Sequence, residues 1–505
     1  MAKPEGRSAE GLRAGQLAGN PRVVRRIKRE LRLQRTLGVP ALFSSGYGNV
    51  GSSIYYALGV TAVFALGATP FALALAGVFF ILTVFTYTEA TVAVPEAGGA
   101  SNFARQGFNE LVSFITGWGT LLSYTVTISI SAFSAVGYLG VFFPIFQQER
   151  ADVIGAIVII LLLAGLNLLG AEEASTLSVI FAVLDLGTEI VLVIVGGIFL
   201  VVMVTVTHPF FLSQIHWGTA PSGLNFIQGA AIAMVAYTGI ETISNLSEEA
   251  KDPEKTVPRS YATLIFAVLI LFIGISIIAL SALPVFKDSH GQYTTLLAQQ
   301  PPKGFITDPV AGIAGQLPHP ASDILKPLVA VLAATILLIA ANAGILGASR
   351  LSFSMGTYRQ VPAILNKIHP RFGTPSVAII FFSVVAVVIV IPGDITLLTA
   401  LYIFGSTLGF TMAHASLIAM RLRGAKHTWR APLNIPVGGG RSIPLTAVIG
   451  GLGTLGVWVL QGLGNPFSRY VGLAWMIGGA TLYVLYRRRQ HLPITKSVER
   501  QFEER

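Results

Sequence analysis

The sequence predicts an all-α integral membrane protein with about twelve transmembrane helices. Only 11% of its 505 residues are charged and 53% are hydrophobic, whereas a soluble chain normally carries about 25% charged residues. Apolar runs of roughly 20 residues, the length that crosses the hydrocarbon core of a bilayer, recur along the whole chain. Each run is expected to be a helix, because lipid cannot satisfy open backbone groups.

The expected spans are closely spaced, except that longer polar stretches separate five from six and seven from eight. They divide the chain into a basic N-terminal tail (1–39), a ten-helix core (40–420), two further helices (421–486) and a C-terminal tail (487–505). The spans are 40–66, 69–94, 110–143, 152–170, 175–205, 224–246, 260–285, 325–349, 375–392, 394–420, 443–462 and 470–486.

The positive charges predict the orientation. If the N-terminus is cytoplasmic, 29 of the 34 Lys and Arg residues fall on the inner side, as the positive-inside rule requires. No secretory signal is apparent, so both termini are expected in the cytoplasm of a multi-pass plasma-membrane protein. The segment 22–35 is expected to form a basic amphipathic helix on the inner leaflet. The formal charge of +10 does not indicate nucleic-acid binding, because the basic residues lie in short loops and tails.

The first span contains three glycines within six positions: Gly46, Gly48 and Gly51. Glycine weakens a helix by about 1 kcal/mol relative to alanine and permits other dihedrals. Local unwinding at this depth would expose N–H and C=O groups that bind a carboxylate or a cation. The alternative is close helix–helix packing through small residues. The polar residues of this run are Asn49, Ser52 and Ser53.

The sixth span favours the first interpretation. It places Gly239 and Glu241 near the membrane interior, in the run Ala236-Tyr237-Thr238-Gly239-Ile240-Glu241. Interrupted helices at matching positions of two five-helix halves are typical of inverted-repeat carriers. The sequence therefore predicts a substrate site between spans one and six.

Four stretches carry a family resemblance. Residues 51–55 (GSSIY) are similar to a Gly-x-Gly-Ile-Phe run, and 95–100 (PEAGGA) to a Pro-x-x-Gly-Gly turn. Residues 248–259 are similar to a Glu-Glu-x-x-x-Pro…Pro-Arg stretch, and 349–375 to the loop after the eighth helix. Over about residues 36–420 the chain thus resembles the amino acid–polyamine–organocation superfamily of permeases.

The resemblance implies a five-plus-five inverted repeat with broken helices one and six, plus two extra helices. In the family, N–H groups at the first break bind the substrate carboxylate, and groups at the sixth receive its amino group. Here Ser53 stands where the family has a second glycine. A potassium-importing branch also has a run similar to residues 238–245. The predicted substrate-binding residues are Gly48, Asn49, Gly51, Ser52, Ser53, Ala236, Tyr237 and Gly239.

Carboxylates inside the membrane are candidates for coupling transport to protons or a monovalent cation. Asp185 and Glu189 share a helix face one turn apart, and two such charges cannot both be cheaply ionised. Glu241 follows the sixth-span glycine. The alternatives are that Glu189 faces a water-filled vestibule, that Asp185 bonds to a neighbouring helix, and that Glu241 braces the unwound backbone through a hydrogen bond. Glu89 is interpreted as structural or gating, and Tyr47, Tyr55, Tyr56, Tyr124 and Tyr237 as possible gates.

The sequence therefore predicts a secondary transporter of amino acids or related small amines, working by alternating access and coupled to protons. The alternatives are a potassium/proton symporter of the same superfamily and a sensor that transports nothing. An enzyme is not expected, because hydrolase and phosphate-binding motifs are missing. No cofactor, no metal and no nucleic-acid partner is expected. The outer loop 286–324 is predicted to be a cap or flexible loop, or alternatively a lid.

Overall fold

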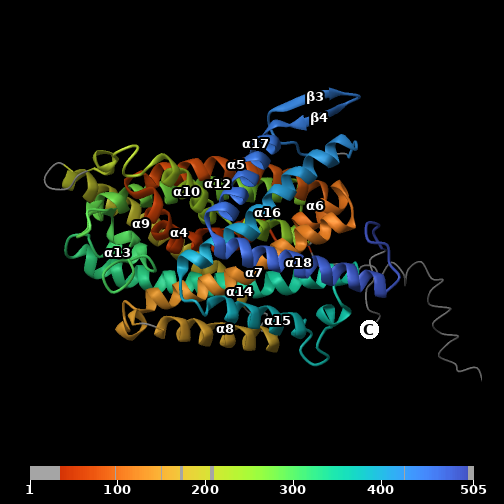
Figure 1. Cartoon of the computed structure of the whole chain (residues 1–505), viewed down its shortest axis with the longest axis horizontal. Coiled ribbons are helices and arrows are strands. Elements are labelled where there is room, and N and C mark those ends of the chain that lie inside the picture. The colour runs from red at the N-terminus through yellow and green to blue at the C-terminus, as the bar shows by residue number, and fades with distance from the viewer. Residues whose placement is uncertain are drawn as a thin grey trace, which may run out of the picture.

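The computed structural model describes residues 35–96, 98–148, 150–170, 174–204, 210–425 and 427–498, most of which are helical (Figure 1). Nine continuous helical stretches among these residues are apolar and long enough to cross a membrane. The longest, Val39–Ala93, contains two crossings, since the chain turns at Leu66–Ala68. The shorter apolar helix α15 and the 24-residue α18 complete the twelve expected segments. The predicted basic helix at 22–35 lies, except for its last residue, outside the described residues.

The twelve segments are joined by connections that are mostly short, with longer ones before α10 and α14. Segments one to six are α3 (Val39–Val50) with α4 (Ile54–Ala65), α5 (Thr69–Ala93), α7 (Glu110–Leu139), α8 (Ala151–Leu169), α9 (Ala174–Val204), and α10 (Gly223–Ala233) with α11 (Glu241–Asn245). Segments seven to twelve are α12 (Pro253–Ala282), α14 (Ala321–Thr357), α15 (Ser376–Val390), α16 (Ile395–Leu422), α17 (Leu445–Gly464) and α18 (Pro466–Arg489). The connections include α6 (Ala100–Gly107), α13 (Pro309–Ala314), and two antiparallel hairpins, β1 (Phe286–Lys287) with β2 (Tyr293–Thr294) and β3 (Asn434–Gly438) with β4 (Arg441–Pro444).

Two helices extend well beyond their apolar runs. α12 begins at Pro253 rather than near residue 260. A proline is well suited to the first helical position, where its missing N–H has no intrahelical partner anyway. α14 continues to Thr357, well past the predicted residue 349. Hydrophobicity predicts where a chain meets lipid, not where its helix ends in water.

The segments differ in how deeply they lie in the bundle. In its most apolar stretch, α7 is 94% buried, whereas α8 is only 17% buried. α7 packs against both α14 and α16, and α8 lies along one edge (Figure 1). Polar residues on α7, such as Thr125 and Ser129, donate their hydroxyl hydrogens to carbonyl groups one turn earlier. The protein interior therefore surrounds α7, and lipid faces α8.

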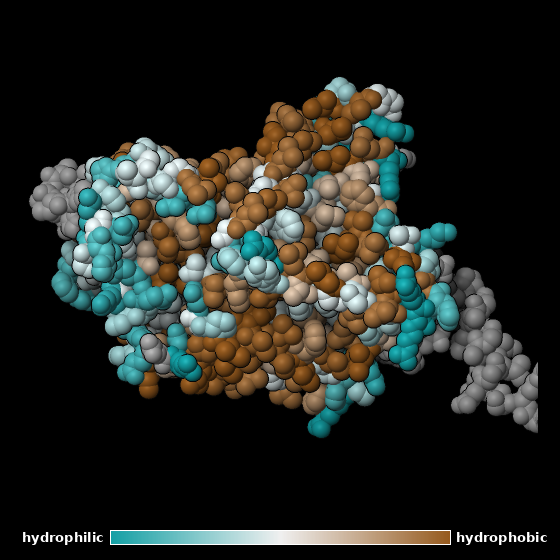
Figure 2. Space-filling model, viewed as in Figure 1, coloured by the Kyte–Doolittle hydropathy of each residue, from teal (hydrophilic) through white to brown (hydrophobic). Residues whose placement is uncertain are grey.

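The two ends of the bundle are polar and differ in structure. Figure 2 shows a wide hydrophobic surface between hydrophilic ends. We call one of them the basic end; it includes the connections at 94–96, 98–109, 246–252, 358–375, 423–425 and 427–444. We call the other the capped end; it carries residues 283–320. Contacts across the basic end include the Leu37 N–H to the Glu249 C=O at 3.0 Å.

The predicted outer loop is an ordered cap. Leu297, Ile306 and every residue of α13 are buried. The cap lies directly on α4, where a Cβ added to Gly59 would be 2.7 Å from the Ile306 carbonyl oxygen. The segment is thus packed onto α4, the second half of the first crossing.

Candidate functional site

The sixth crossing is broken at Gly239. α10 runs into a 3₁₀ turn at Met234–Tyr237, Thr238 is extended, and Gly239 has a φ of +101°. L-residues with side chains rarely adopt that conformation, which glycine accepts freely. The chain then resumes as α11 at Glu241. The break predicted from the glycine is confirmed in position.

The first crossing is interrupted more tightly than its glycines predict. Val50 and Ile54 are separated only by the 3₁₀ turn Gly51–Ser53, and the dihedrals of this turn stay in the right-handed helical region. The Gly51 N–H bonds to the Tyr47 C=O. A Cβ on Gly51 would lie 2.8 Å from the Tyr47 ring. In this conformation the glycine makes room for an aromatic ring that lies across it.

The two breaks touch each other through Asn49. A Cβ on Gly239 would lie 2.8 Å from the Asn49 Cγ. The Asn49 Nδ2 donates to the Thr242 hydroxyl at 2.8 Å, and the Ser52 hydroxyl donates to the Asn49 C=O at 2.9 Å. Within the described residues the Asn49 Oδ1 is buried without a hydrogen-bond partner. An unpaired buried acceptor of this kind is ready to receive a donor from a ligand.

The predicted substrate-binding residues come together, with one exception in the direction of a side chain. The Tyr237 hydroxyl donates to the Leu73 C=O at 2.8 Å, and its ring packs against Phe80 and Phe272. Tyr237 therefore meets α5 and α12 with its side chain. The residues of this group, all buried, are Gly48, Asn49, Gly51, Ser52, Ser53, Ala236, Tyr237 and Gly239.

Glu241 gives the site an acidic group. It is 5% exposed, and its Oε2 has no hydrogen-bond partner in the described part of the chain. The ion pairs of the described residues do not include it. Tyrosines from four helices lie near enough to the carboxyl group to interact with it electrostatically: Tyr87, Tyr124, Tyr261 and Tyr402. A buried carboxyl group without a basic partner favours a proton or a cationic ligand.

Asp185 and Glu189 lie beside the first crossing, apart from the break of the sixth. The Tyr55 hydroxyl donates to the Asp185 Oδ1 at 2.6 Å, and the Tyr47 hydroxyl donates to the Glu189 Oε2 at 2.5 Å. Both carboxylates are buried. Two of the predicted gates, Tyr47 and Tyr55, thus donate hydrogen bonds to the acidic pair. The sequence alone did not indicate these contacts, which join positions more than 100 residues apart.

Glu89 serves a different purpose. Arg421 of α16 donates two hydrogen bonds to its carboxylate, from Nε to Oε1 at 2.6 Å and from Nη2 to Oε2 at 2.5 Å. The Ala431 N–H donates a third to Oε2 at 2.7 Å. His427 lies 3.1 Å away. These contacts fasten α5 to the end of α16 at the basic end. The structural interpretation of Glu89 fits them, and its arginine partner was not foreseen.

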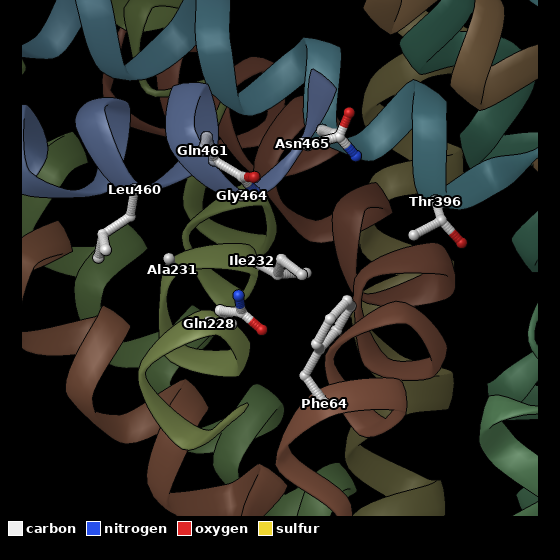
Figure 3. Close-up of a pocket in the computed structure, with 10 residues that line it drawn as sticks. Phe64, Gln228, Ala231, Ile232, Thr396, Leu460, Gln461, Gly464 and Asn465 are labelled. Atoms are coloured by element: carbon white, nitrogen blue, oxygen red, sulfur yellow. The ribbon is translucent and has the colours of Figure 1, made fainter. Parts of the chain in front are cut away.

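A hollow on the capped side lies elsewhere. Figure 3 shows it between α4, α10, α16 and α17, with about 450 Å³ of empty space that is partly open to solvent. Phe64, Gln228 and Gln461 are among the residues that line it. The predicted substrate-binding residues are not among its lining. The residues of the central site are buried in this structure.

The sequence of this chain matches a known protein family. Residues 37–473 match the family described as amino acid permease. The chloroplastic cationic amino acid transporter 7 of Arabidopsis thaliana is 26% identical over 77% of this chain and 66% of its own length. The methylthioribose transporter of Bacillus subtilis is 25% identical over 91% of this chain and 95% of its own.

A third relative, the low-affinity putrescine importer PlaP of Escherichia coli, is 26% identical over 73% of this chain and 76% of its own. All three relatives are transporters by name, and each is similar to this chain over 73% or more of this chain's length. The family match alone covers more than four fifths of the sequence. This chain therefore belongs to the amino acid permease family and is a multi-pass membrane transporter, not an enzyme.

Proposed function

We propose that this protein is a secondary transporter that carries amino acids or related small amines across the plasma membrane by alternating access, coupled to protons. The observation that carries the proposal is the contact between the two interrupted crossings. Asn49 meets Gly239 there, close to a buried carboxyl group at Glu241. Inverted-repeat carriers bind cargo at such paired breaks.

The polar groups of the site suit a cationic amine. The free Asn49 Oδ1 and Glu241 Oε2 are both acceptors, and an ammonium group is a donor with three N–H bonds. A substrate carboxylate would be received by N–H groups of the Gly51–Ser53 turn. The Gly51 N–H is bonded to the Tyr47 C=O in this conformation, so binding there requires the turn to open.

The names of the relatives agree with this chemistry in part. Two are named for cationic amino acids and for putrescine, and both kinds of cargo carry amino groups. The third is named for methylthioribose, which has none. At 25–26% identity the cargo differs among the relatives themselves, so we base the amine on the unpaired acceptors of the site.

Counterflow in proteoliposomes tests the proposal. Purified protein is reconstituted into vesicles loaded with one unlabelled compound, and entry of the same labelled compound is followed for a panel of amino acids and amines. We expect accumulation of at least one of them. Absence of exchange for the whole panel, by a protein that still binds a panel member, would establish a sensor instead.

Glu241→Gln tests coupling at the site. The amide keeps the shape of the side chain and cannot take up or release a proton. We expect counterflow to persist and uptake to depend less steeply on external pH. An unchanged pH profile and rate would remove Glu241 from the coupling mechanism and leave Asp185 and Glu189.

A potassium/proton symporter is the second candidate. Three buried carboxyl groups, Asp185, Glu189 and Glu241, have an oxygen without a hydrogen-bond partner in the described residues, which is also the chemistry of a cation path. This candidate requires uptake of rubidium that does not respond to amino acids. For either cargo, we propose that residues 40–420 form the transporting core and that the basic end is cytoplasmic.

A further inference from the structure

Two carboxylates of α9 contact the two halves of the first crossing through tyrosine hydroxyls. Glu189 accepts the Tyr47 hydroxyl from α3 at 2.5 Å. Asp185 accepts the Tyr55 hydroxyl from α4 at 2.6 Å. The 3₁₀ turn Gly51–Ser53 lies between these tyrosines. One turn of α9 thus contacts the crossing on both sides of its interruption.

Each carboxylate also has an unused oxygen. Asp185 Oδ2 and Glu189 Oε1 are buried, and neither has a hydrogen-bond partner within the described part of the chain. A buried carboxylate oxygen without a donor is costly unless a proton or cation occupies it. Two carboxylates one helical turn apart add mutual repulsion. The pair is therefore built to bind a positive charge.

The groups that face this pair are hydroxyls rather than bases. Tyr47, Tyr55 and, from α7, Tyr138 are its ionisable neighbours. α12 and α14 also pack against α9. Three ionisable side chains of these two helices contact groups other than the acidic pair. Lys255 pairs with Asp252, Arg350 with Glu249, and Tyr261 with the Ile240 C=O. The described ion pairs therefore leave the charge of the pair uncompensated.

The two halves lead to opposite ends of the molecule. The Tyr55 C=O accepts the Tyr138 hydroxyl at 3.0 Å, and the Tyr138 oxygen accepts the Val310 N–H of α13 at 3.3 Å. The α4 half is thus connected to the cap. Just before α3, Leu37 exchanges backbone hydrogen bonds with Glu249 and Lys251 at the basic end. A change at the carboxylates reaches both ends through helix one.

We propose that protonation of the Asp185–Glu189 pair is the switch that releases the two halves of helix one. The inference rests on the proposed alternating-access function. A hydronium ion on one side of the membrane gives a proton to Asp185 Oδ2 or Glu189 Oε1, which forms one O–H bond and leaves a water molecule. The proton passes to water on the other side and restores the carboxylate. Hydrogen bonds to a charged acceptor are about twice as strong as those to a neutral one. Protonation of Asp185 therefore loosens Tyr55 and the cap, and protonation of Glu189 loosens Tyr47.

Single cysteines report each half, because the chain has no cysteine of its own. Ile306→Cys reports the cap side and Ser44→Cys reports α3; both positions are buried, at 2% and 6% exposure. Asp308 lies in the cap beside Ile306, so all variants carry Asp308→Asn to remove its titration. Maleimide labelling is measured in proteoliposomes between pH 5 and 8, together with counterflow.

Maleimide reacts with the thiolate, so every cysteine labels more slowly at low pH. Labelling is therefore divided by that of the exposed Ser289→Cys at the same pH, and we expect this ratio at position 306 to rise as the pH falls. Tyr55→Phe should raise it about tenfold at high pH and abolish its pH dependence, the effect of losing one charge-assisted hydrogen bond. Asp185→Asn, a permanently neutral acceptor, should do the same. Tyr47→Phe should act at position 44 and leave position 306 unchanged. The control is Tyr483→Phe on α18, which removes a buried hydroxyl that donates to the Ile494 C=O. It should change labelling at neither position.

The results separate this inference from the proposed function. Suppose that counterflow is intact and that Tyr55→Phe and Asp185→Asn both label with the same pH dependence as the parent Asp308→Asn chain. The proposed proton switch is then wrong, and the proposed transport function is unaffected. If labelling follows sodium or potassium at constant pH, the pair binds a metal cation and the proton switch is also wrong. If counterflow is absent but the labelling behaves as described, the switch stands and the proposed cargo class fails. Thermal unfolding of each variant identifies any that are misfolded.

Discussion

Gly239 has a backbone conformation that side chains oppose. Its φ is +101°, and an added Cβ would lie 2.8 Å from Asn49. A non-glycine residue in such a conformation is strained by about 1–3 kcal/mol, before any clash is counted. We predict that Gly239→Ala lowers the unfolding temperature and greatly reduces transport. Thermal unfolding and counterflow measure the two effects.

Gly165 provides the matched control. It lies within α8, and a Cβ added there would have no atom within 4 Å. Gly165→Ala removes a poor helix former at no steric cost, so stability is expected to stay the same or rise by up to about 1 kcal/mol. Equal losses from both substitutions would show that the break at Gly239 has no special role.

Asp308 makes the cap sensitive to pH. Burial raises the pKa of this carboxyl group to about 7, against the opposing effect of Lys326. The folded chain therefore keeps its proton up to about pH 7, whereas the unfolded chain loses it near pH 4. The free energy of unfolding therefore falls by at most roughly 4 kcal/mol as the pH rises through this window, and it is level above it. Asp308→Asn should flatten the unfolding temperature between pH 4 and 7; an unchanged slope would contradict this.

At the scale of elements, one ion pair fastens α5 to α16. Glu89 and Arg421 are 0% and 3% exposed at their side chains. Removing one partner of a buried pair leaves an uncompensated charge and costs about 3–5 kcal/mol. We predict a loss of this size for Glu89→Gln in chemical or thermal unfolding. Lys255→Gln is the control, because the Lys255–Asp252 pair is 72% and 48% exposed and contributes about 1 kcal/mol or less.

The elements were largely predictable, since lipid makes apolar length a direct signal for a helix. The ends of α12 and α14 were not, because they continue as helices outside the apolar region. The break of helix six was predictable from Gly239, whose positive φ needs glycine. The tight turn of helix one was not, because Gly46 and Gly51 make room for Ile243 and Tyr47 instead. Composition cannot distinguish a glycine that unwinds a helix from one that accepts a neighbour.

At the scale of the whole molecule, the polar ends should lie on opposite sides of the membrane. Ser289 at the capped end and Thr428 at the basic end are both exposed, and a cysteine at either is the only one in the chain. We predict that an impermeant maleimide labels Ser289→Cys in intact cells, and Thr428→Cys only after permeabilisation. The reverse pattern would overturn the orientation that the positive charges predict.

The candidate site was predictable only to the level of its elements. Motif and repeat indicated helices one and six, and the structure brings Asn49 and Gly239 together. Side-chain partners such as Tyr47 with Glu189, or Glu89 with Arg421, join distant parts of the sequence. Such pairs depend on how helices rotate against one another, which periodicity does not specify in helices that are apolar on all sides.

The central claim is that cargo with an amino group occupies the space between the breaks of helices one and six. Counterflow of a labelled amino acid or amine by the wild type and by Gly239→Ala, with rubidium uptake measured in the same vesicles, tests it most directly. We predict amine exchange by the wild type, its loss in the variant, and no rubidium uptake. Rubidium uptake that ignores every amino acid and amine would contradict the claim.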